Sequence, residues 1–293
     1  MEKINAKAFL KVAETGSFRK AAEEMGYTQA GMSYIISSME EETGLQLFLR
    51  ERSGVRLSPE GLALMPHMKQ YEIWEAQLEQ AVNDLKGLEQ GTIRVLIFNS
   101  ISVHWIPGIL SHFLADYPNI KVELITEEDS ARAEQMVFSG EVDCGFFLTG
   151  VKADLDVFTL KEERLCAIVS EDHPLADRKC FPIAELGNYP YIEMKYEEHT
   201  GIRSIFEKHG VEPNTLFCMD NDNAAMSMVS KGLGYAILAE LVLHEVPFKL
   251  RVMDLEVPEK RTISIGTRSL KTCSNACRAF IDYTRDWVEE QAR

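Results

Sequence analysis

The sequence lacks any long apolar run and any pattern typical of an export signal. It opens with the charged residues Glu2 and Lys3, and its 293 residues contain no run of about 18 apolar residues of the kind a bilayer-spanning helix requires. We therefore expect a cytoplasmic protein that does not bind a membrane.

Cysteine and histidine are too scattered for a disulfide scaffold or a metal centre. The six cysteines form no Cys-x-x-Cys pair, and the seven histidines show no clear ligand spacing. Cys273 and Cys277 lie four residues apart on a predicted helix. Burial as small apolar groups is the ordinary interpretation, and a thiol redox sensor is the alternative. The sequence predicts no metal site and no cofactor.

The motifs of several common enzyme classes are also missing. There is no His-Glu-x-x-His sequence, no nucleophile elbow and no phosphate-binding loop. We therefore predict no catalytic residues. An enzyme built on a binding-protein scaffold is the alternative, and it would need titratable groups that converge in some other way.

Basic residues are scarce. The chain has 31 lysines and arginines against 46 acidic residues, a net charge of −15, which argues against a protein that coats nucleic acid non-specifically. The deficit is uneven, because the first sixty residues carry eight basic and nine acidic residues and are nearly neutral. A hydrophobic content of 45% over this length is enough for two or more domains with their own cores.

A predicted helix at 28–39 has one apolar face and one small, hydroxyl-rich face. Met32, Ile35, Ile36 and Met39 recur at helical spacing. The opposite side carries Ala30, Tyr34, Ser37 and Glu41, with Ser33 and Ser38 at its flanks. Such a face can enter a DNA groove and donate to phosphates or base edges. An ordinary amphipathic surface helix is the alternative.

The residues before this helix favour a helix-turn-helix. Ser17 can cap a helix at 18–25, and Gly26 suits the left-handed conformation that ends one. Thr28 then caps the next helix after a very short turn. Two short helices joined in this way, with an earlier helix near 4–14 to close the core, are typical of DNA-binding domains whose second helix reads the groove.

Three stretches resemble the LysR-type transcriptional regulator family. They are residues 9–22 (FLKVAETGSFRKAA), residues 45–50 (LQLFLR) and residues 55–61 (VRLSPEG). The resemblance implies an N-terminal, largely α-helical winged helix-turn-helix, a long linker helix and a two-lobed α/β effector domain like a periplasmic binding protein. It also implies double-stranded operator DNA as a partner, with RNA polymerase as a further candidate.

The reading helix departs from the family pattern, which usually begins Ser-Gln-Pro-Ala-Val-Ser and has a basic residue soon after. Gln29 and Ser33 match directly and Thr28 conservatively, but the proline and the basic residue are absent. The operator sequence therefore does not follow from the resemblance. The expected DNA contacts on this helix are Thr28, Gln29, Ser33, Tyr34 and Ser37.

Three arginines follow the predicted helices. Arg50, Arg52 and Arg56 belong to a predicted wing and its approach, and the second strand of this wing is 55–57. We expect them to contact phosphates or the minor groove. A solvated turn with surface arginines is the alternative.

A long helix follows the wing. Ser58 and Pro59 are a cap and a first helical residue, and the pattern continues to about Leu88. Its apolar seam, which includes Trp74 and Leu78, has roughly heptad spacing. Pairing with a second copy would bury this seam and place two reading helices on two half-sites. Packing on its own effector domain is the alternative. We expect residues 1–58 to bind DNA and residues 59–90 to dimerise, giving a dimer or a tetramer.

Residues 91–293 alternate between strand and helix patterns. Strands at 92–98, 120–126 and 142–148 and helices at 103–117 and 131–139 predict an α/β lobe. We assign 91–160 and 266–293 to this first lobe and 161–265 to a second, leaving a ligand cleft at the strand ends.

Polar residues at predicted strand and helix ends mark the expected effector site. The loop after the first strand holds Asn99, Ser100 and Ser102, Thr149 follows the third strand, and Thr200 begins a helix of the second lobe. Hydroxyls and free helix amides suit a carboxylate or another polar ligand, although each residue alone is often just a cap. No arginine is assured there, so the charge of the effector stays open.

These patterns predict a sequence-specific DNA-binding regulator whose activity changes when a small molecule binds between the lobes. Activation and repression are both compatible with them. A transport-type solute-binding protein would need an export signal, which the sequence lacks.

Overall fold

The structure is a computed structural model that describes residues 4–51, 54–85, 91–148, 150–195 and 201–291. It divides into two units, Met1–Lys86 and Gly87–Arg293, each of which is described by itself. Three predicted site residues, Arg52, Thr149 and Thr200, lie outside the described residues.

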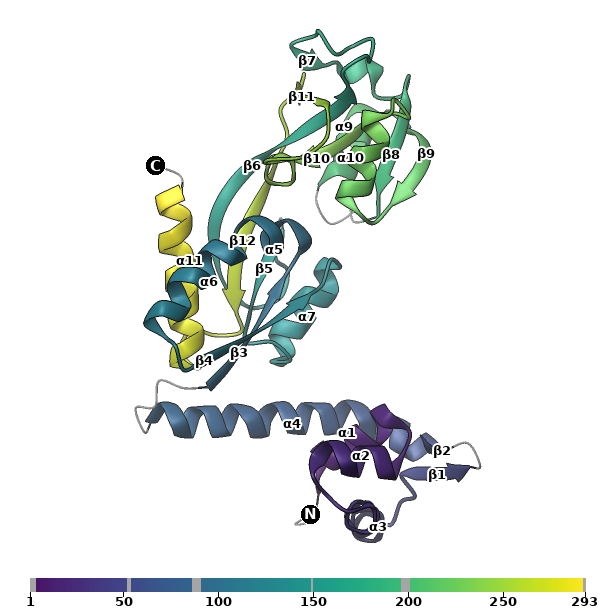
Figure 1. The fold of residues 1–293 in the computed structure, drawn as a ribbon, viewed down its shortest axis with the longest axis vertical. Coiled ribbons are helices and arrows are strands. Elements are labelled where there is room, and N and C mark those ends of the chain that lie inside the picture. The colour runs from purple at the N-terminus through teal and green to yellow at the C-terminus, as the bar shows by residue number, and fades with distance from the viewer. Residues whose placement is uncertain (1–3, 52–53, 86–90, 149, 196–200, 292–293) are drawn as a thin grey trace. The chain divides into compact units, whose positions relative to one another are not determined.

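The N-terminal unit begins with three helices and a two-stranded wing (Figure 1). The elements are α1 (Ala6–Thr15), α2 (Phe18–Met25), α3 (Gln29–Thr43), β1 (Phe48–Glu51) and β2 (Gly54–Leu57). The predicted caps and turn of the helix-turn-helix are confirmed, because Ser17 caps α2, Gly26 ends it at φ 72°, and Thr28 caps α3. The helix α3 continues to Thr43, beyond the predicted end at residue 39.

One apolar core joins these three helices to the wing. Phe9, Met32, Ile36 and Met39 are almost completely buried, and Phe48 enters the same cluster from β1. Burying a side chain of this size stabilises a fold by about 1.5–3 kcal/mol, so this cluster fixes the orientation of α3. The apolar face predicted for α3 is its core face, except that Ile35 is only partly buried.

The long helix α4 (Pro59–Leu85) follows and continues through Pro66. Ser58 caps it, since the Gly61 amide donates to Ser58 Oγ at 2.9 Å. Along the helix, Leu62, Trp74 and Leu78 are 61%, 51% and 68% exposed. These side chains belong to the predicted apolar seam.

The first lobe of the C-terminal unit is a sheet with helices on both faces. Its strands are β3 (Gly91–Ile97), β4 (Ile120–Thr126), β5 (Cys144–Leu148), β12 (Lys260–Thr267) and the first part of β6 (Asp156–Ser170). Its helices are α5 (Asn99–His104), α6 (Ile106–Asp116), α7 (Ser130–Ser139) and α11 (Asn275–Gln291). Side chains of α5, α6 and α11 share one core, and those of α7 pack in another.

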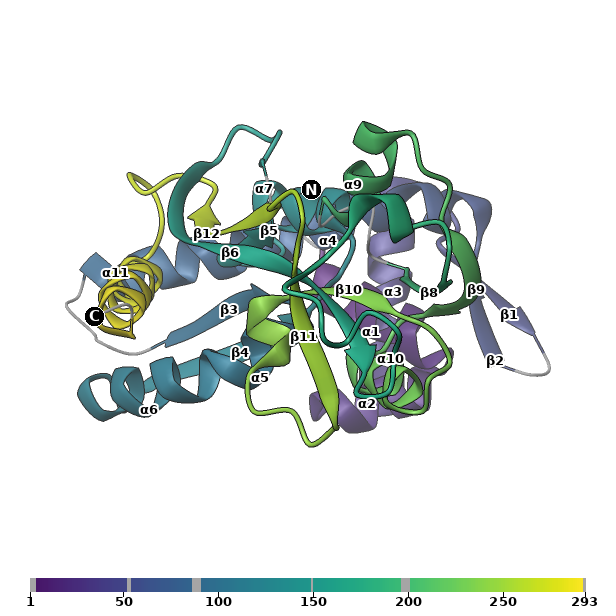
Figure 2. The ribbon, with the colours of Figure 1, turned by 90° about the horizontal axis from the view of Figure 1, so that it is seen from above.

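The long strand β6 continues from the first lobe into the second, as Figures 1 and 2 show. It pairs with β12 from Asp156 to Arg164 and then with β10 and β11 from Leu165 onward. The crossing therefore falls beside the cross-strand pair Glu163 and Arg261. The expected change of lobe at 265/266 lies within β12, whose residues from Ile263 onward also pair with β5.

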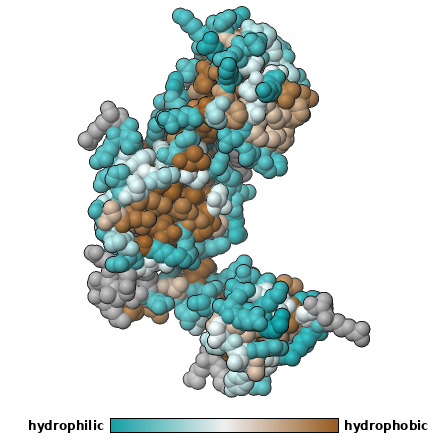
Figure 3. Space-filling model, viewed as in Figure 1, coloured by the Kyte–Doolittle hydropathy of each residue, from teal (hydrophilic) through white to brown (hydrophobic). Residues whose placement is uncertain are grey.

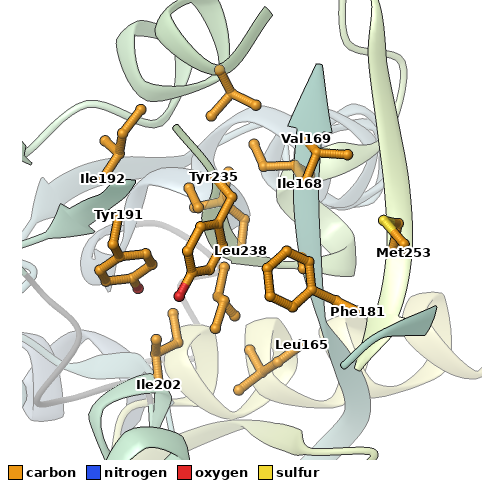
Figure 4. Packing of buried hydrophobic residues seen from close by; sticks show 14 of the residues in the cluster. Leu165, Ile168, Val169, Phe181, Tyr191, Ile192, Ile202, Tyr235, Leu238 and Met253 are labelled. Carbon is orange, nitrogen blue, oxygen red and sulfur yellow. The ribbon is translucent and has the colours of Figure 1, made fainter. Parts of the chain in front are cut away.

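The second lobe packs around a cluster of large side chains. Figure 4 shows Tyr191, Tyr235 and Phe181 meeting between the strands, and the Tyr235 hydroxyl donates to the Leu186 carbonyl. Its strands are β7 (Cys180–Phe181), β8 (Pro190–Met194), β9 (Asn214–Met219), β10 (Ala236–Ala239) and β11 (Leu250–Leu255). Its helical segments are η1 (Ile183–Glu185), α9 (Ile202–His209), α10 (Asp222–Ser230) and η2 (Glu240–Leu243).

Two local predictions for the first lobe are wrong. Residues 99–102 were expected to be a loop, but they are the first residues of α5. The single helix expected at 103–117 is instead divided between α5 and α6, which meet at Trp105. The ring of Trp105 is buried against Phe146, so tertiary packing decides where the two helices join.

Among the described residues, no helix is both long enough and apolar enough to cross a membrane.

Candidate DNA-binding surface and effector site

The exposed face of α3 presents small and polar groups. Thr28 and Gln29 are exposed, Ser33 and Ser37 are partly buried, and Tyr34 is 71% exposed. The Thr28 hydroxyl accepts a hydrogen bond from the Gly31 amide at 3.0 Å, which leaves other first-turn amides directed outward. This surface has the size and donor groups that a DNA groove accepts.

Arg50 lies beside α3. Its guanidinium is 5.1 Å from the centre of the Phe18 ring, and Nη2 donates to Ser33 Oγ at 3.0 Å. A planar cation held between a ring and a hydroxyl is pre-oriented. Arg50 and Ser33 therefore form one polar unit at the edge of the reading helix.

Arg56 lies on the other face of the wing. Leu49 opposes Arg56 and Arg50 opposes Val55 in the β1–β2 ladder, so the two arginines point to opposite sides. Arg56 forms a short ion pair with Glu51. A phosphate would have to compete with Glu51 for this arginine, whereas Arg50 forms no ion pair with an acidic residue in the described part of the chain.

The start of α5 meets the second lobe through Asn99. Its side-chain Nδ2 donates to Asp222 Oδ2 of α10 at 3.2 Å, and its backbone amide donates to Glu128 Oε1 at 2.8 Å. Burial, with Asp222 nearby, raises the pKa of Glu128, although the Asn99 amide opposes that shift. Asn99 thus connects the two lobes between two carboxylates.

Ser100 is buried at the lobe crossing and contacts an arginine. Arg261 Nη2 donates to Ser100 Oγ at 3.2 Å, and Arg261 Nε donates to Glu163 Oε1 at 2.6 Å. The other Glu163 oxygen accepts from the Leu241 amide at 2.7 Å. The side chains of Arg261 and Glu163 are 4% and 1% exposed, so this charge pair is shielded from water.

Sequence reasoning missed Arg261 and Glu163, and the chain offers no local signal for them. They are 98 residues apart, and only the pairing of β6 with β12 brings them together. Ser102, by contrast, was expected at the site, and its hydroxyl donates to the Asn99 carbonyl at 2.6 Å within its own helix.

Among the described residues, no group of three or more potential ligands is arranged to hold a metal ion. Cys273 and Cys277 are in contact through their thiols, and Cys144 contacts Cys277 from β5. The contact with Cys277 and burial raise the pKa of Cys273. The contact with Cys144 and burial raise the pKa of Cys277, although the contact with Cys273 opposes that shift. A raised pKa disfavours the reactive thiolate.

A winged helix-turn-helix combined with a two-lobed α/β unit is the architecture of a ligand-responsive DNA-binding regulator. The family model for the bacterial regulatory helix-turn-helix proteins of the lysR family matches residues 5–62, and that for the LysR substrate binding domain matches residues 86–289. The chain therefore belongs to the LysR family of DNA-binding transcriptional regulators, whose second domain binds a small-molecule effector.

Named relatives agree with this assignment, and solved structures share the fold. The uncharacterized regulator YvbU of Bacillus subtilis is 29% identical, with 96% of each chain covered. The transcriptional activator CmpR of Synechocystis sp. is 27% identical, over 94% of this chain and 92% of that one. The fold is similar to CbnR in complex with its target DNA (TM-score 0.73, 19% identity, 98% and 100% covered). It is also similar to the effector-binding domain of QuiR with shikimate (TM-score 0.59, 19% identity, 69% and 98% covered).

Proposed function

We propose that α3 reads the major groove of operator DNA and that the wing contacts the adjacent backbone. The predicted DNA contacts are Thr28, Gln29, Ser33, Tyr34, Ser37, Arg50, Arg52 and Arg56. The observation that carries this proposal is the exposed face of α3, whose N-terminus is capped and whose Ser33 is already bonded to Arg50. Base edges are read by such donors and acceptors, and phosphates by arginine.

We propose that the effector binds where the lobes meet, at Asn99, Ser100 and Ser102, with Thr149 and Thr200 in the same cleft. Asn99 already bonds across the lobes to Asp222, and Ser100 is held by Arg261. A ligand that forms bonds with these groups in one arrangement of the lobes would shift the population toward that arrangement.

Two apolar surfaces support self-association. One is the seam on α4, where Leu62, Trp74 and Leu78 are exposed. The other lies on the effector unit, where Figure 3 shows an area of apolar side chains. Exposed large apolar residues of this unit include Val103 of α5 and Leu114 of α6. Exposed patches of this kind mark interfaces. We propose a dimer built on α4, with the effector units as a second contact that could extend it to a tetramer.

The same proposal assigns residues 1–58 to DNA binding, 59–90 to dimerisation and 91–293 to effector binding. It places the protein in the cytoplasm, where operator DNA and RNA polymerase are found, and makes RNA polymerase its candidate partner in activation. It assigns no catalysis, and the named relatives are transcriptional regulators. Turnover by the isolated residues 90–293 would contradict that assignment.

The DNA-binding proposal is tested by selecting duplexes from a random pool and measuring the affinity of variants. Ser33→Ala removes a groove-facing hydroxyl and frees Arg50, so we expect operator affinity to fall about tenfold, equivalent to one good base contact. Ser38→Ala makes the same chemical change on the same helix at a side chain that is 8% exposed, and it serves as the control. Equal affinity of Ser33→Ala and wild type at physiological salt would reject the assignment.

The effector proposal is tested by thermal-shift screening of small metabolites against the full-length protein. A compound that stabilises the wild type should stabilise Ser100→Ala less, because the variant loses the hydroxyl at the lobe crossing. Ser111→Ala is the control, because the Ser111 hydroxyl donates to the Gly108 carbonyl and contacts the His112 ring, both on its own helix α6. An undiminished shift for Ser100→Ala would exclude Ser100 from the site.

A further inference from the structure

The base of the wing is held from one side by a glutamate of the reading helix. Glu40, in the last turns of α3, accepts hydrogen bonds at a single carboxylate oxygen from the amides of Leu47 (2.7 Å) and Phe48 (3.1 Å). Both of these residues are buried, at 0% and 3% exposure. A buried amide without an acceptor is costly, so the Glu40 side chain fixes where β1 begins.

The same segment is held from the other side by the start of α4. Ser58, which is 1% exposed, donates from Oγ to the Gln46 carbonyl at 2.5 Å and from its amide to the Leu47 carbonyl at 2.9 Å. A Cβ at Gly61 would lie 2.2 Å from the Leu47 carbonyl oxygen, so α4 approaches this segment as closely as the backbone permits. Residues 46–48 are therefore bonded to the reading helix and to the linker helix at once.

Glu40 is an unusual residue to find near a polyanion, since a carboxylate close to phosphates weakens DNA binding. Its two amide bonds give it a role that a neutral side chain without an acceptor could not take. Glu41, the next residue, is exposed and forms no such amide bonds among the described residues. Removing the charge of Glu41 therefore measures how a carboxylate at this end of α3 affects DNA affinity by its charge alone.

We propose that Glu40 is a positioning residue for DNA binding: by fixing residues 46–48, it makes the wing and the reading helix address DNA as one rigid body. Ser58 extends this link to α4, so a rotation of the linker helix moves the wing with it. The inference rests on the proposed DNA contacts of α3 and the wing. It adds to them a residue that touches neither groove nor phosphate.

Two substitutions separate the effect of the length of the Glu40 side chain from the effect of its charge. Glu40→Asp keeps the charge but is one methylene too short for the two amides. Glu40→Gln loses the charge but keeps an oxygen at the same reach. On duplexes selected by the full-length wild type, we expect Glu40→Asp to bind about tenfold more weakly, equivalent to one lost hydrogen bond. We expect Glu40→Gln to stay within about threefold of wild type. Glu41→Gln measures the effect of charge alone.

The salt dependence of binding and the DNA footprint show whether Glu40→Asp has lost the contacts of the wing with DNA. For Glu40→Asp, the slope of log affinity against log salt should fall by about one for each wing phosphate contact released. Hydroxyl-radical protection should disappear at the flank while the central base pairs stay protected. A purely structural role would lower the melting temperature without changing the slope or the footprint.

Each outcome decides the matter. If affinity follows charge, with Glu40→Asp equal to wild type and Glu40→Gln equal to Glu41→Gln, the inference is overturned. If Glu40→Asp does not fold, Glu40→Gln still decides, because loss of its flanking protection would overturn the inference and retention would support it. If the wild type selects no duplex, the DNA-binding proposal fails and the inference fails with it.

Discussion

At the scale of single residues, the buried pair Arg261 and Glu163 connects β12 to β6 at the lobe crossing. Both charges are removed from water at the lobe crossing, and their remaining bonds go to Ser100 and the Leu241 amide. Desolvating two ions is expensive, so such a pair adds little net stability, but removing one partner leaves an uncompensated buried charge.

We therefore predict that Arg261→Met destabilises the effector unit by about 3–5 kcal/mol in urea unfolding. The double variant Arg261→Met with Glu163→Leu should recover most of this loss, because no charge is left unpaired. Lys260→Met is the matched control. The side chains of Lys260 and its partner Glu162 are 58% and 60% exposed. Exposed ion pairs contribute only about 0–1 kcal/mol to the free energy of unfolding. A small effect of Arg261→Met would contradict the shielding seen here.

His104 gives a prediction for pH. Its ring lies 6.0 Å from that of His244, between α5 and the end of η2, and burial and this neighbour lower the pKa of His104 below its usual value. Glu245 and Glu163 partly oppose the shift. The folded state thus favours the neutral ring, so the unfolded state takes up a proton first as the pH falls.

The contribution of His104 to the stability of the folded state is therefore complete above pH 6.5, the ordinary pKa of a histidine. This contribution is lost as the pH falls through the lowered pKa of His104. We expect the melting temperature of His104→Gln to change less between pH 7 and pH 5.5 than that of wild type (roughly the range in which histidine titrates). Burial also lowers the pKa of His173, so some dependence should persist, and His173→Gln is the comparison. Identical pH profiles for His104→Gln and wild type would refute this account.

At the scale of elements, the N-terminal unit could be predicted well because its signals are local. The caps Ser17 and Thr28 and the stop Gly26 act within a few residues of where they stand, and each does so in the structure. The apolar spacing of α3 likewise identifies its core face. Capping and amphipathic spacing are short-range effects that the sequence displays directly.

The candidate effector site was harder to predict because long-range pairing brings its residues together. The sequence around Ser100 shows small polar residues at the end of a strand, and these marked it as a candidate. Its contact with Arg261 forms only because β12 pairs with β6. Asn99 likewise meets Asp222 from a helix 123 positions away. The sequence identified Asn99 and Ser100 as candidates, but it contained no signal for the charged partners that surround them.

The exposed seam of α4 leads to a prediction about assembly. Leu78 is 68% exposed, and burying it in a paired helix would stabilise the pair by about 1.5–3 kcal/mol for each copy. We expect Leu78→Glu to raise the dimer dissociation constant about a hundredfold or more, as measured by analytical ultracentrifugation. Glu79→Gln alters a neighbouring exposed charge and should leave the dimer intact. A dimeric Leu78→Glu protein would show that α4 buries its seam elsewhere.

At the scale of the whole molecule, the low basic charge leads us to expect that tight DNA binding requires the proposed dimer. A net charge of −15 and a reading helix without lysine or arginine give each copy little general attraction to phosphates. We expect affinity to come from specific contacts and from the two linked copies of the proposed dimer. The second half-site is bound from a high effective concentration once the first is occupied.

We predict that the wild type binds a duplex with two selected half-sites about a hundredfold or more tightly than a duplex with one, an avidity gain typical of linked sites. Leu78→Glu should bind both duplexes with similar, weak affinity, since its copies act separately. Moving the half-sites apart by half a helical turn should also abolish the wild-type gain, because the two reading helices then face opposite sides of the duplex. If the wild type bound one half-site as tightly as two, a single helix-turn-helix with few basic residues would have to supply the whole affinity, which its hydroxyl-rich surface argues against.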